Sequence, residues 1–210
     1  MKTHYLFIGL VVFFSSCDFG DSEKGKLTGT QSEIGATGAT FALSATGISG
    51  VSNMQASVTK NTDGISSING TATLTNSMLT QVIKAIPGTL SQSGNVVTLN
   101  DLKVKFKSDG VEKVNGINPG VLVNYNSSVG DVYAAESSKT KREVTAKTTT
   151  DSYDWGGMKI KTMEVTESIN AYGIKSMQYI ANHKWGIVGI LITFDDNSTI
   201  KIPVTSSKSN

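Results

Sequence analysis

The chain has 210 residues, of which 19 are Lys or Arg and 17 are Asp or Glu, so its formal net charge is only +2. Proteins that bind nucleic acid through phosphate contacts concentrate far more positive charge on one face, so this balance argues against a nucleic-acid partner. The length favours one domain, and an aromatic content of 7% with abundant Ser, Thr, Asn and Gly is typical of an extracytoplasmic β-protein rather than a cytoplasmic enzyme.

The first 16 residues have the layout of a secretory signal peptide. A short polar start containing Lys2 is followed by about ten apolar residues, Tyr5 to Phe14, and then by the small pair Ser15-Ser16. A transmembrane helix needs ~20 apolar residues, so this run is too short to cross a bilayer. The sequence therefore predicts a signal peptide over residues 1–16.

Cys17 is the only cysteine in the chain and follows the apolar run directly. A lone cysteine in an exported protein has no partner for an internal disulfide, and an exposed thiol is reactive in an oxidising compartment. Phe14-Ser15-Ser16-Cys17 resembles the lipobox of bacterial lipoproteins, although the family pattern usually has an aliphatic residue in place of Phe14. The resemblance implies that Cys17 is lipidated and holds the protein on a membrane of the cell envelope, the outer membrane in preference to the inner. Plain secretion is the alternative.

Residues 17–40 carry few large apolar side chains and many Gly, Ser and Thr. Such a segment buries too little apolar surface to offset its ordering entropy. We therefore expect a lipidated N-terminus and a flexible tether over residues 17–40, followed by a β-rich globular domain over residues 41–210.

Within that domain, short segments of alternating apolar and polar residues are separated by turn signals. Examples are MQASVTK before NTDG and NVVTLNDLKVKFK before SDG. Strands joined by short polar turns need no crossover helix, so the pattern predicts a mainly β fold with a single antiparallel domain. Its sheet is expected to form either a curved half-barrel or a two-layer sandwich.

The clearest hairpin is at the C-terminal end, where residues 190–194 and 199–204 are β-branched runs on either side of a turn-forming tetrad, residues 195–198. Pro203 lies in the second run and has no N–H to donate to a ladder. It therefore suggests that this strand is at an edge of the sheet or that Pro203 is at the end of the strand.

One segment, NSMLTQVIKAIPG over residues 76–88, has a helical pattern instead. Asn76 or Ser77 is a suitable N-cap, apolar residues recur along one side, and Pro87-Gly88 ends the pattern. We predict a short amphipathic helix near residues 76–86. Its apolar face, with Met78, Val82 and Ile86, either packs on the sheet or forms a lid over a hydrophobic cavity.

Catalysis is constrained by the residues that the chain lacks. Beyond the leader, the only histidine is His183 and the only cysteine is Cys17, so neither a Cys/His metal site nor a Cys-His dyad can form within one chain. Two acid pairs remain, Asp151 with Asp154 and Asp195 with Asp196, and turn formation is the default role of both. We therefore expect a non-enzymatic protein without catalytic residues, metal or cofactor.

The most site-like surface stretch is DSYDWGG, residues 151–157. Tyr153 and Trp155 would offer flat aromatic faces to a sugar ring or a lipid, and Asp154 would accept hydrogen bonds. The alternative is that Trp155 pins the loop to the core.

Together these patterns predict a membrane-anchored envelope lipoprotein that binds a hydrophobic ligand, a glycan or a protein partner, with its oligomeric state left open. The alternatives are a structural or adhesive cell-surface protein and a hydrolase that uses paired carboxylates. A broad curved sheet with one helix inside would resemble, in architecture only, the lipid-carrier fold found among bacterial periplasmic lipoproteins. The candidate ligand-binding residues are Met78, Val82, Ile86, Tyr153, Asp154 and Trp155.

Overall fold

The computed structural model describes residues 26–47, 49–77, 79–80, 83, 89–134 and 140–207. Within this part of the chain the elements are η1 (Glu33–Gly35), β1 (Thr40–Leu43), β2 (Val51–Thr62), β3 (Ile65–Leu74), β4 (Leu90–Ser93), β5 (Val96–Lys107), β6 (Gly110–Lys113), β7 (Gly120–Asn124), β8 (Val132–Ala134), β9 (Lys141–Lys147), β10 (Tyr153–Trp155), β11 (Met158–Ile160), β12 (Met163–Ala171), β13 (Ile174–Asn182), β14 (Gly186–Phe194) and β15 (Thr199–Ser207). Between β3 and β4, Ser77, Leu79, Thr80 and Ile83 are helical. The predicted mainly β class is confirmed.

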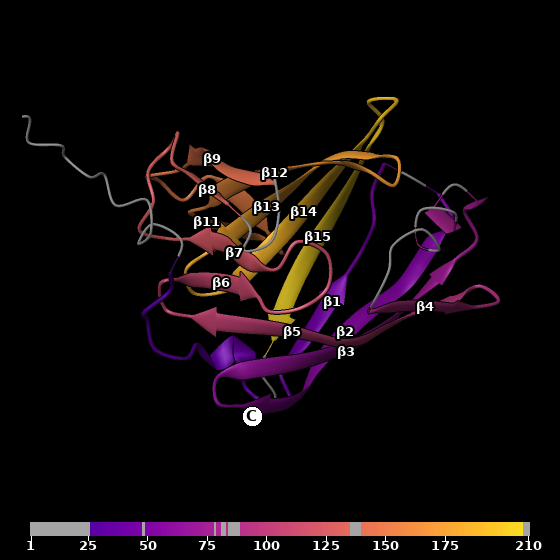
Figure 1. Ribbon diagram of the computed structural model, residues 1–210, viewed down its shortest axis with the longest axis horizontal. Coiled ribbons are helices and arrows are strands. Elements are labelled where there is room, and N and C mark those ends of the chain that lie inside the picture. The colour runs from indigo at the N-terminus through magenta and orange to yellow at the C-terminus, as the bar shows by residue number, and fades with distance from the viewer. Residues whose placement is uncertain are drawn as a thin grey trace, which may run out of the picture.

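Thirteen of these strands form one antiparallel sheet in the order β7-β6-β5-β3-β2-β1-β15-β14-β13-β12-β9-β8, with β4 paired to β5 (Figure 1). Most neighbours in the sheet are also neighbours in sequence, as short polar turns dictate. The predicted C-terminal hairpin is β14–β15, and its turn is closed by Asp196 Oδ1, which accepts hydrogen bonds from the Ser198 N–H (2.8 Å) and hydroxyl (2.6 Å). These bonds lower the pKa of the Asp196 carboxyl.

The first and last strands of the sheet, β7 and β8, approach each other, so the sheet is curled nearly into a barrel. Side chains rather than a backbone ladder join the two sides. Arg142 Nη1 on β9 donates a hydrogen bond to the Val121 carbonyl on β7 (2.9 Å), and the Tyr133 hydroxyl on β8 donates one to the Leu122 carbonyl (3.1 Å). Of the two architectures predicted, the curved sheet is the one observed.

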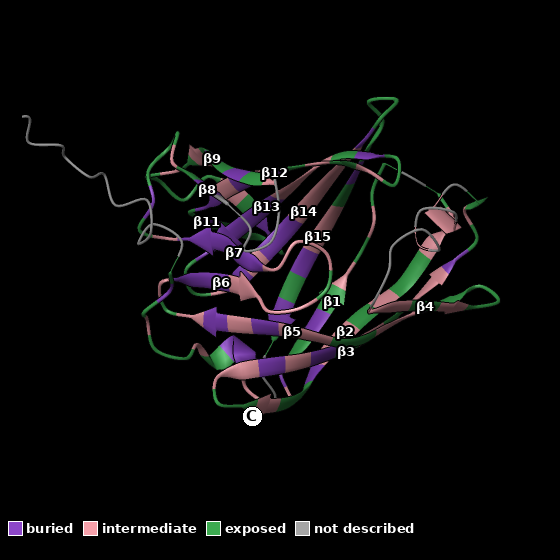
Figure 2. Cartoon of the chain, viewed as in Figure 1, coloured by how far each residue is buried: buried purple, intermediate pink, exposed green. Residues whose placement is uncertain are grey.

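The largest group of buried apolar side chains fills the end of the curled sheet where β5–β7 face β9 and β12–β13. Phe41 and Phe106 stack there with ring centroids 5.9 Å apart, and Val144 and Val165 are fully buried. Figure 2 shows that the parts of β2–β4 at the other end of the long axis are mostly intermediate or exposed. One end of the sheet is therefore a packed core.

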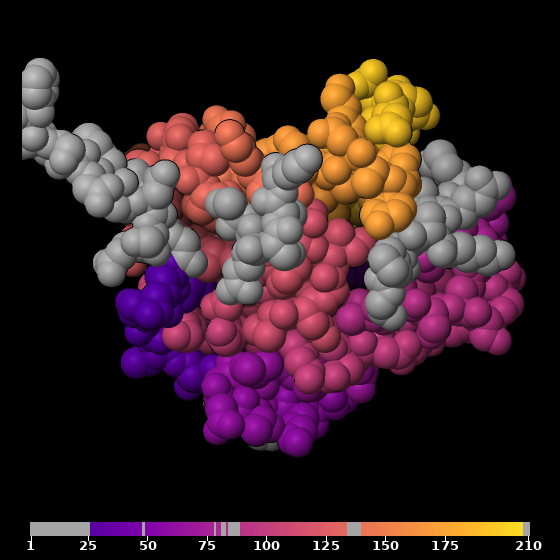
Figure 3. All heavy atoms as spheres, in the orientation of Figure 1, coloured from indigo at the N-terminus to yellow at the C-terminus, as the bar shows by residue number. Residues whose placement is uncertain are grey.

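The N-terminal segment of the described chain lies against this packed end (Figure 3). Leu27 and Ile34 are buried among its apolar side chains. Asp109 Oδ2 accepts hydrogen bonds from the backbone N–H groups of Thr28 (2.6 Å) and Gly29 (2.7 Å). The tether predicted over residues 17–40 is therefore wrong from residue 26 onwards, because two well-placed apolar side chains and one carboxylate suffice to hold this polar segment on the domain.

Pro203 also departs from its prediction. Its strand, β15, is central, between β1 and β14, and continues to Ser207. The regular ladder with β1 ends at the Leu43–Val204 pair, and beyond it the Pro203 carbonyl accepts a hydrogen bond from the Ser44 N–H (3.3 Å). The proline is tolerated because its missing N–H lies where the neighbouring strand has just ended.

Candidate ligand-binding cavity

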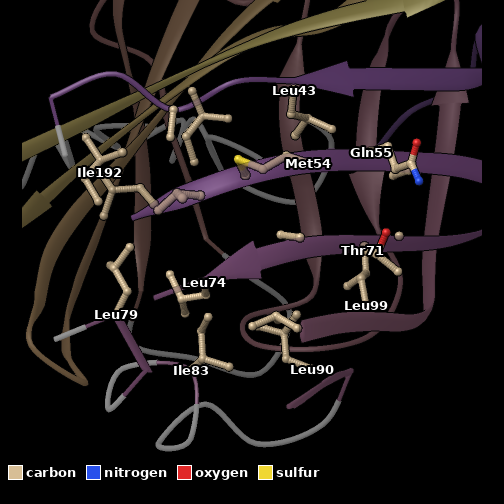
Figure 4. Close-up of a pocket in the computed structure, with 18 of the residues that line it drawn as sticks. Leu43, Met54, Gln55, Thr71, Leu74, Leu79, Ile83, Leu90, Leu99 and Ile192 are labelled. Atoms are coloured by element: carbon tan, nitrogen blue, oxygen red, sulfur yellow. The ribbon is translucent and has the colours of Figure 1, made fainter. Parts of the chain in front are cut away.

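A cavity of about 340 Å³ lies between the two halves of the curled sheet. One wall comes from β2, β3 and β5, and the other from β13, β14 and β15. Figure 4 shows Leu79, Ile83 and Leu90 on one side of it and Leu43 and Met54 on the opposite side. The helical turn and β4 therefore complete the cavity where the sheet alone leaves it open.

The alternation of the strands explains why the cavity is apolar. Residues two apart project to the same face of a strand, and on β15 this places both Ile200 and Ile202 in the lining. On β3 two of the inward positions are small, Gly70 and Ala72. A Cβ atom at Gly70 would lie 2.7 Å from the Gln55 carbonyl oxygen, so no side chain fits there. These small side chains leave a space at this end of the sheet, whereas at the other end larger side chains fill the interior.

The chemistry of the cavity is that of hydrocarbon. Among the residues that line it, only Gln55 and Thr71 have polar side chains, and both residues are exposed on the sheet surface. None of the described residues in the lining is charged. A site with this lining is suited to apolar groups.

The helix predicted near residues 76–86 is present in the described part of that segment. Asn76 is its N-cap, because Asn76 Oδ1 accepts a hydrogen bond from the Leu79 N–H (3.1 Å) and the Asn76 carbonyl accepts one from the Thr80 N–H (3.0 Å). Leu79 and Ile83, four residues apart on one helix face, both line the cavity. The predicted ligand-binding residues of this helix, Met78, Val82 and Ile86, lie outside the described residues.

Most of the lining comes from strand residues that sequence reasoning did not single out, such as Met54, Leu99, Met177 and Ile192. Their alternation marks them as inward-facing, but core-facing and cavity-facing residues are apolar alike. The only signal specific to a cavity is the cluster of small inward residues, Gly70 and Ala72, and it is visible only once the strands are paired.

The aromatic stretch at residues 153–155 is not the exposed loop that the sequence suggested. It forms the β10–β11 hairpin, in which Trp155 is only 5% exposed and donates a hydrogen bond from Nε1 to the Val204 carbonyl (2.7 Å). Tyr153 is half-buried, and burial raises the pKa of its hydroxyl. Asp154 is exposed and forms an ion pair with Lys159 (3.1 Å). Trp155 therefore has no free face for a sugar ring and pins the hairpin to the sheet.

A buried polar network borders the cavity without lining it. Arg142 Nη2 is 3.2 Å from Glu167 Oε1, both side chains are fully buried, and the Tyr179 hydroxyl donates a hydrogen bond to Glu167 Oε2 (2.8 Å). Glu167 is paired across strands with Met177, which lines the cavity. Burial raises the pKa of Tyr179 far above its usual value. Arg142 on β9 also donates hydrogen bonds to the carbonyl groups of Asn118 and Val121, near the start of β7. The network therefore helps to hold the two ends of the curled sheet together.

Fold and site together define an antiparallel β-sheet protein with one packed end and an apolar cavity in the other. Comparison with family models, with curated proteins and with solved structures found no match to this chain. Among the described residues, no three His, Cys, Asp or Glu side chains are grouped so that they would hold a metal ion. No described helix is long and apolar enough to cross a membrane.

Proposed function

We propose that the protein is a non-enzymatic lipoprotein of the bacterial cell envelope that binds a hydrophobic ligand in this cavity. The observation that carries the proposal is the lining, in which apolar side chains from both halves of the sheet and from the helical turn converge on one space. A structural or adhesive protein would gain stability from a filled core. The cavity therefore favours ligand binding over the adhesive alternative.

The size of the cavity supports the same reading. Protein interiors hold few voids larger than a water molecule, because missing contacts cost free energy. The space of about 340 Å³ is open to solvent at one part of its surface and lined by apolar side chains. Binding pockets for small molecules are typically concave, mostly apolar clefts of about 300–1,000 Å³, and this one falls in that range.

The membrane anchor rests on the sequence. The apolar run, the small pair Ser15-Ser16 and the lone Cys17 support lipidation, and two or more acyl chains on one cysteine would hold the protein stably on a membrane. Cys17 lies outside the described residues. The anchor then places a ligand-binding domain at the envelope, where hydrophobic molecules need a carrier or receptor in water.

Binding of the fluorescent hydrophobic probe N-phenylnaphthylamine tests the proposal on the chain from position 17 to 210 carrying Cys17→Ser, which removes the acylation site. We expect saturable binding, and a loss of at least about tenfold in affinity with Ala72→Phe, whose ring would occupy the cavity. Ala42→Phe is the matched control, because Ala42 is on the exposed face of β1. Equal binding by the two variants, with both folded by circular dichroism, would contradict the proposal.

A further inference from the structure

The size of the cavity restricts the class of ligand that it takes. An apolar protein cavity of ~150 Å³ holds one benzene ring, which has six carbons. At the same volume for each carbon, a cavity of 340 Å³ holds roughly 14 carbons. This is the volume of one medium-length acyl chain, and it is too small for the two chains of a membrane phospholipid.

The inner end of the cavity is closed by residues that also pack against the core. Leu43, Ala56, Leu99 and Met177 line the cavity and contact the buried cluster behind it. That cluster contains fully buried side chains such as Val144 and Val165, so the floor rests on packed side chains. A chain that enters tail first therefore meets a fixed end, which sets a maximum length.

The described residues that line the cavity offer no charged partner to the head group of such a ligand. The charged groups of the interior network, Arg142, Glu167 and Lys113, are not among the described residues that line it. Gln55 and Thr71 are on the solvent-exposed side of their strands. Because a polar head without hydrogen-bond partners would be strongly disfavoured inside, it stays in water at the opening.

We propose that the cavity binds one acyl chain of roughly 14 carbons, tail first, from a single-chain amphiphile, and that it selects chain length rather than head group. The inference rests on the proposed function and narrows it to a ligand class. The distance from the opening to the floor of the cavity then determines which chain lengths bind, and no hydrogen bond contributes to the selection.

The test measures displacement of N-phenylnaphthylamine from the same Cys17→Ser chain by two series of amphiphiles, alkyl carboxylates and alkyltrimethylammonium ions. Chains run from about 8 to about 18 carbons and are kept below the concentration at which they form micelles. Affinity should rise roughly fourfold per methylene, which corresponds to ~0.8 kcal/mol, and should level off near ~14 carbons. At equal length the two head groups should agree within about fivefold, as expected for a charge left in solvent.

A substitution at the floor tests the length selection directly. Ala56→Leu adds three carbons to the floor and should move the plateau from roughly 14 to roughly 11 carbons. Ala42→Leu adds the same carbons on the exposed face and should leave the plateau in place. Any of three results would overturn the inference: affinities set by the head group, a plateau that Ala56→Leu does not move, or equal binding of a two-chain phospholipid. If the naphthylamine probe itself does not bind, the proposed function fails first.

Discussion

Lys113 is a partly buried lysine beside the Arg142–Glu167 pair. It lies on β6 and faces the interior, where burial lowers its pKa from 10.5 to about 8. The carboxylate of Glu167 opposes this shift, and the nearby cation of Arg142 adds to it. The polar network inside the sheet therefore combines two cations with one carboxylate, and Lys113 relieves the imbalance by releasing its proton early.

This pKa predicts a rise in stability with pH. Between pH 8 and 10.5 the unfolded chain keeps the proton on Lys113 while the folded chain has lost it, so the free energy of unfolding increases as pH rises through this window. The full effect would be about 3 kcal/mol. Above pH ~10 the trend should reverse, because the partly buried Tyr125 and the buried Tyr133 and Tyr179 hold their protons longer than the unfolded chain does. Urea unfolding across this pH range measures both the rise and the later fall in the free energy of unfolding.

Two lysine substitutions separate Lys113 from general effects of pH. Lys113→Met should be more stable than the parent at pH 7, where the parent still carries a buried charge, and should not gain stability between pH 8 and 10. Lys159→Met removes an exposed lysine and should keep the rise. If the rise survives in Lys113→Met, another group is responsible for it.

Among the elements, the β10–β11 hairpin covers the outer face of β13–β15 and takes no part in the cavity. Trp155 and Ile160 pack on Ile180 and Val188, and Val188 is fully buried as a result. Gly189 on β14 has no side chain because a Cβ atom there would lie 2.9 Å from the Tyr153 hydroxyl. The strands beneath are therefore buried on both faces, with the core on one side and the hairpin on the other.

The structural role of Trp155 can be tested because its substitution should lower the stability of the protein without changing its affinity for the hydrophobic probe. Trp155→Phe removes the hydrogen bond to the Val204 carbonyl and leaves that buried oxygen unpaired, which should cost about 1–3 kcal/mol of unfolding free energy. Trp155→Ala should cost about 3–5 kcal/mol. Both variants should bind N-phenylnaphthylamine as the parent does under conditions where they are folded. A changed probe affinity in folded Trp155→Phe would instead connect the hairpin to ligand binding.

The same elements show how far sequence patterns reach. Local signals sufficed for the C-terminal hairpin, whose turn residues bond within the turn, and for the Asn76 cap, which bonds three residues ahead. The predictions for Pro203 and for the segment from residue 26 were wrong because the environment of each comes from residues distant in sequence. The position of a proline does not predict where β1 ends, and the composition of a segment does not predict that Asp109 will bind it.

The candidate site was only partly predictable for a related reason. Leu79 and Ile83 belong to the apolar stripe of a helix that the sequence identifies, and both line the cavity. The residues of the opposite wall, such as Met177, have the same alternating pattern as Tyr179 in the packed region next to it. Period-two alternation defines which face of a strand is inward, but the distance to the opposite strand depends on the curvature of the whole sheet.

On the scale of the whole molecule, the start of the described chain and the cavity lie at different ends. The described chain begins at Lys26, beside the packed end, whereas β4, which contributes to the cavity, is at the other end of the long axis (Figure 1). The nine residue steps from Cys17 to Lys26 span at most about 30 Å even when fully extended. A lipid on Cys17 would therefore keep the packed end of the domain close to the membrane surface.

The anchor predicts a definite covalent state for the full chain produced in a bacterium. Intact mass spectrometry should find a polypeptide that starts at Cys17 and carries the added mass of acyl groups, and this form should sediment with membranes. Cys17→Ser should lack the acyl mass, because serine has no thiol to form the thioether. A chain with unmodified Cys17 in the soluble fraction would contradict the anchor. The cavity predictions would remain intact, because they are tested on the Cys17→Ser chain, which carries no acyl group.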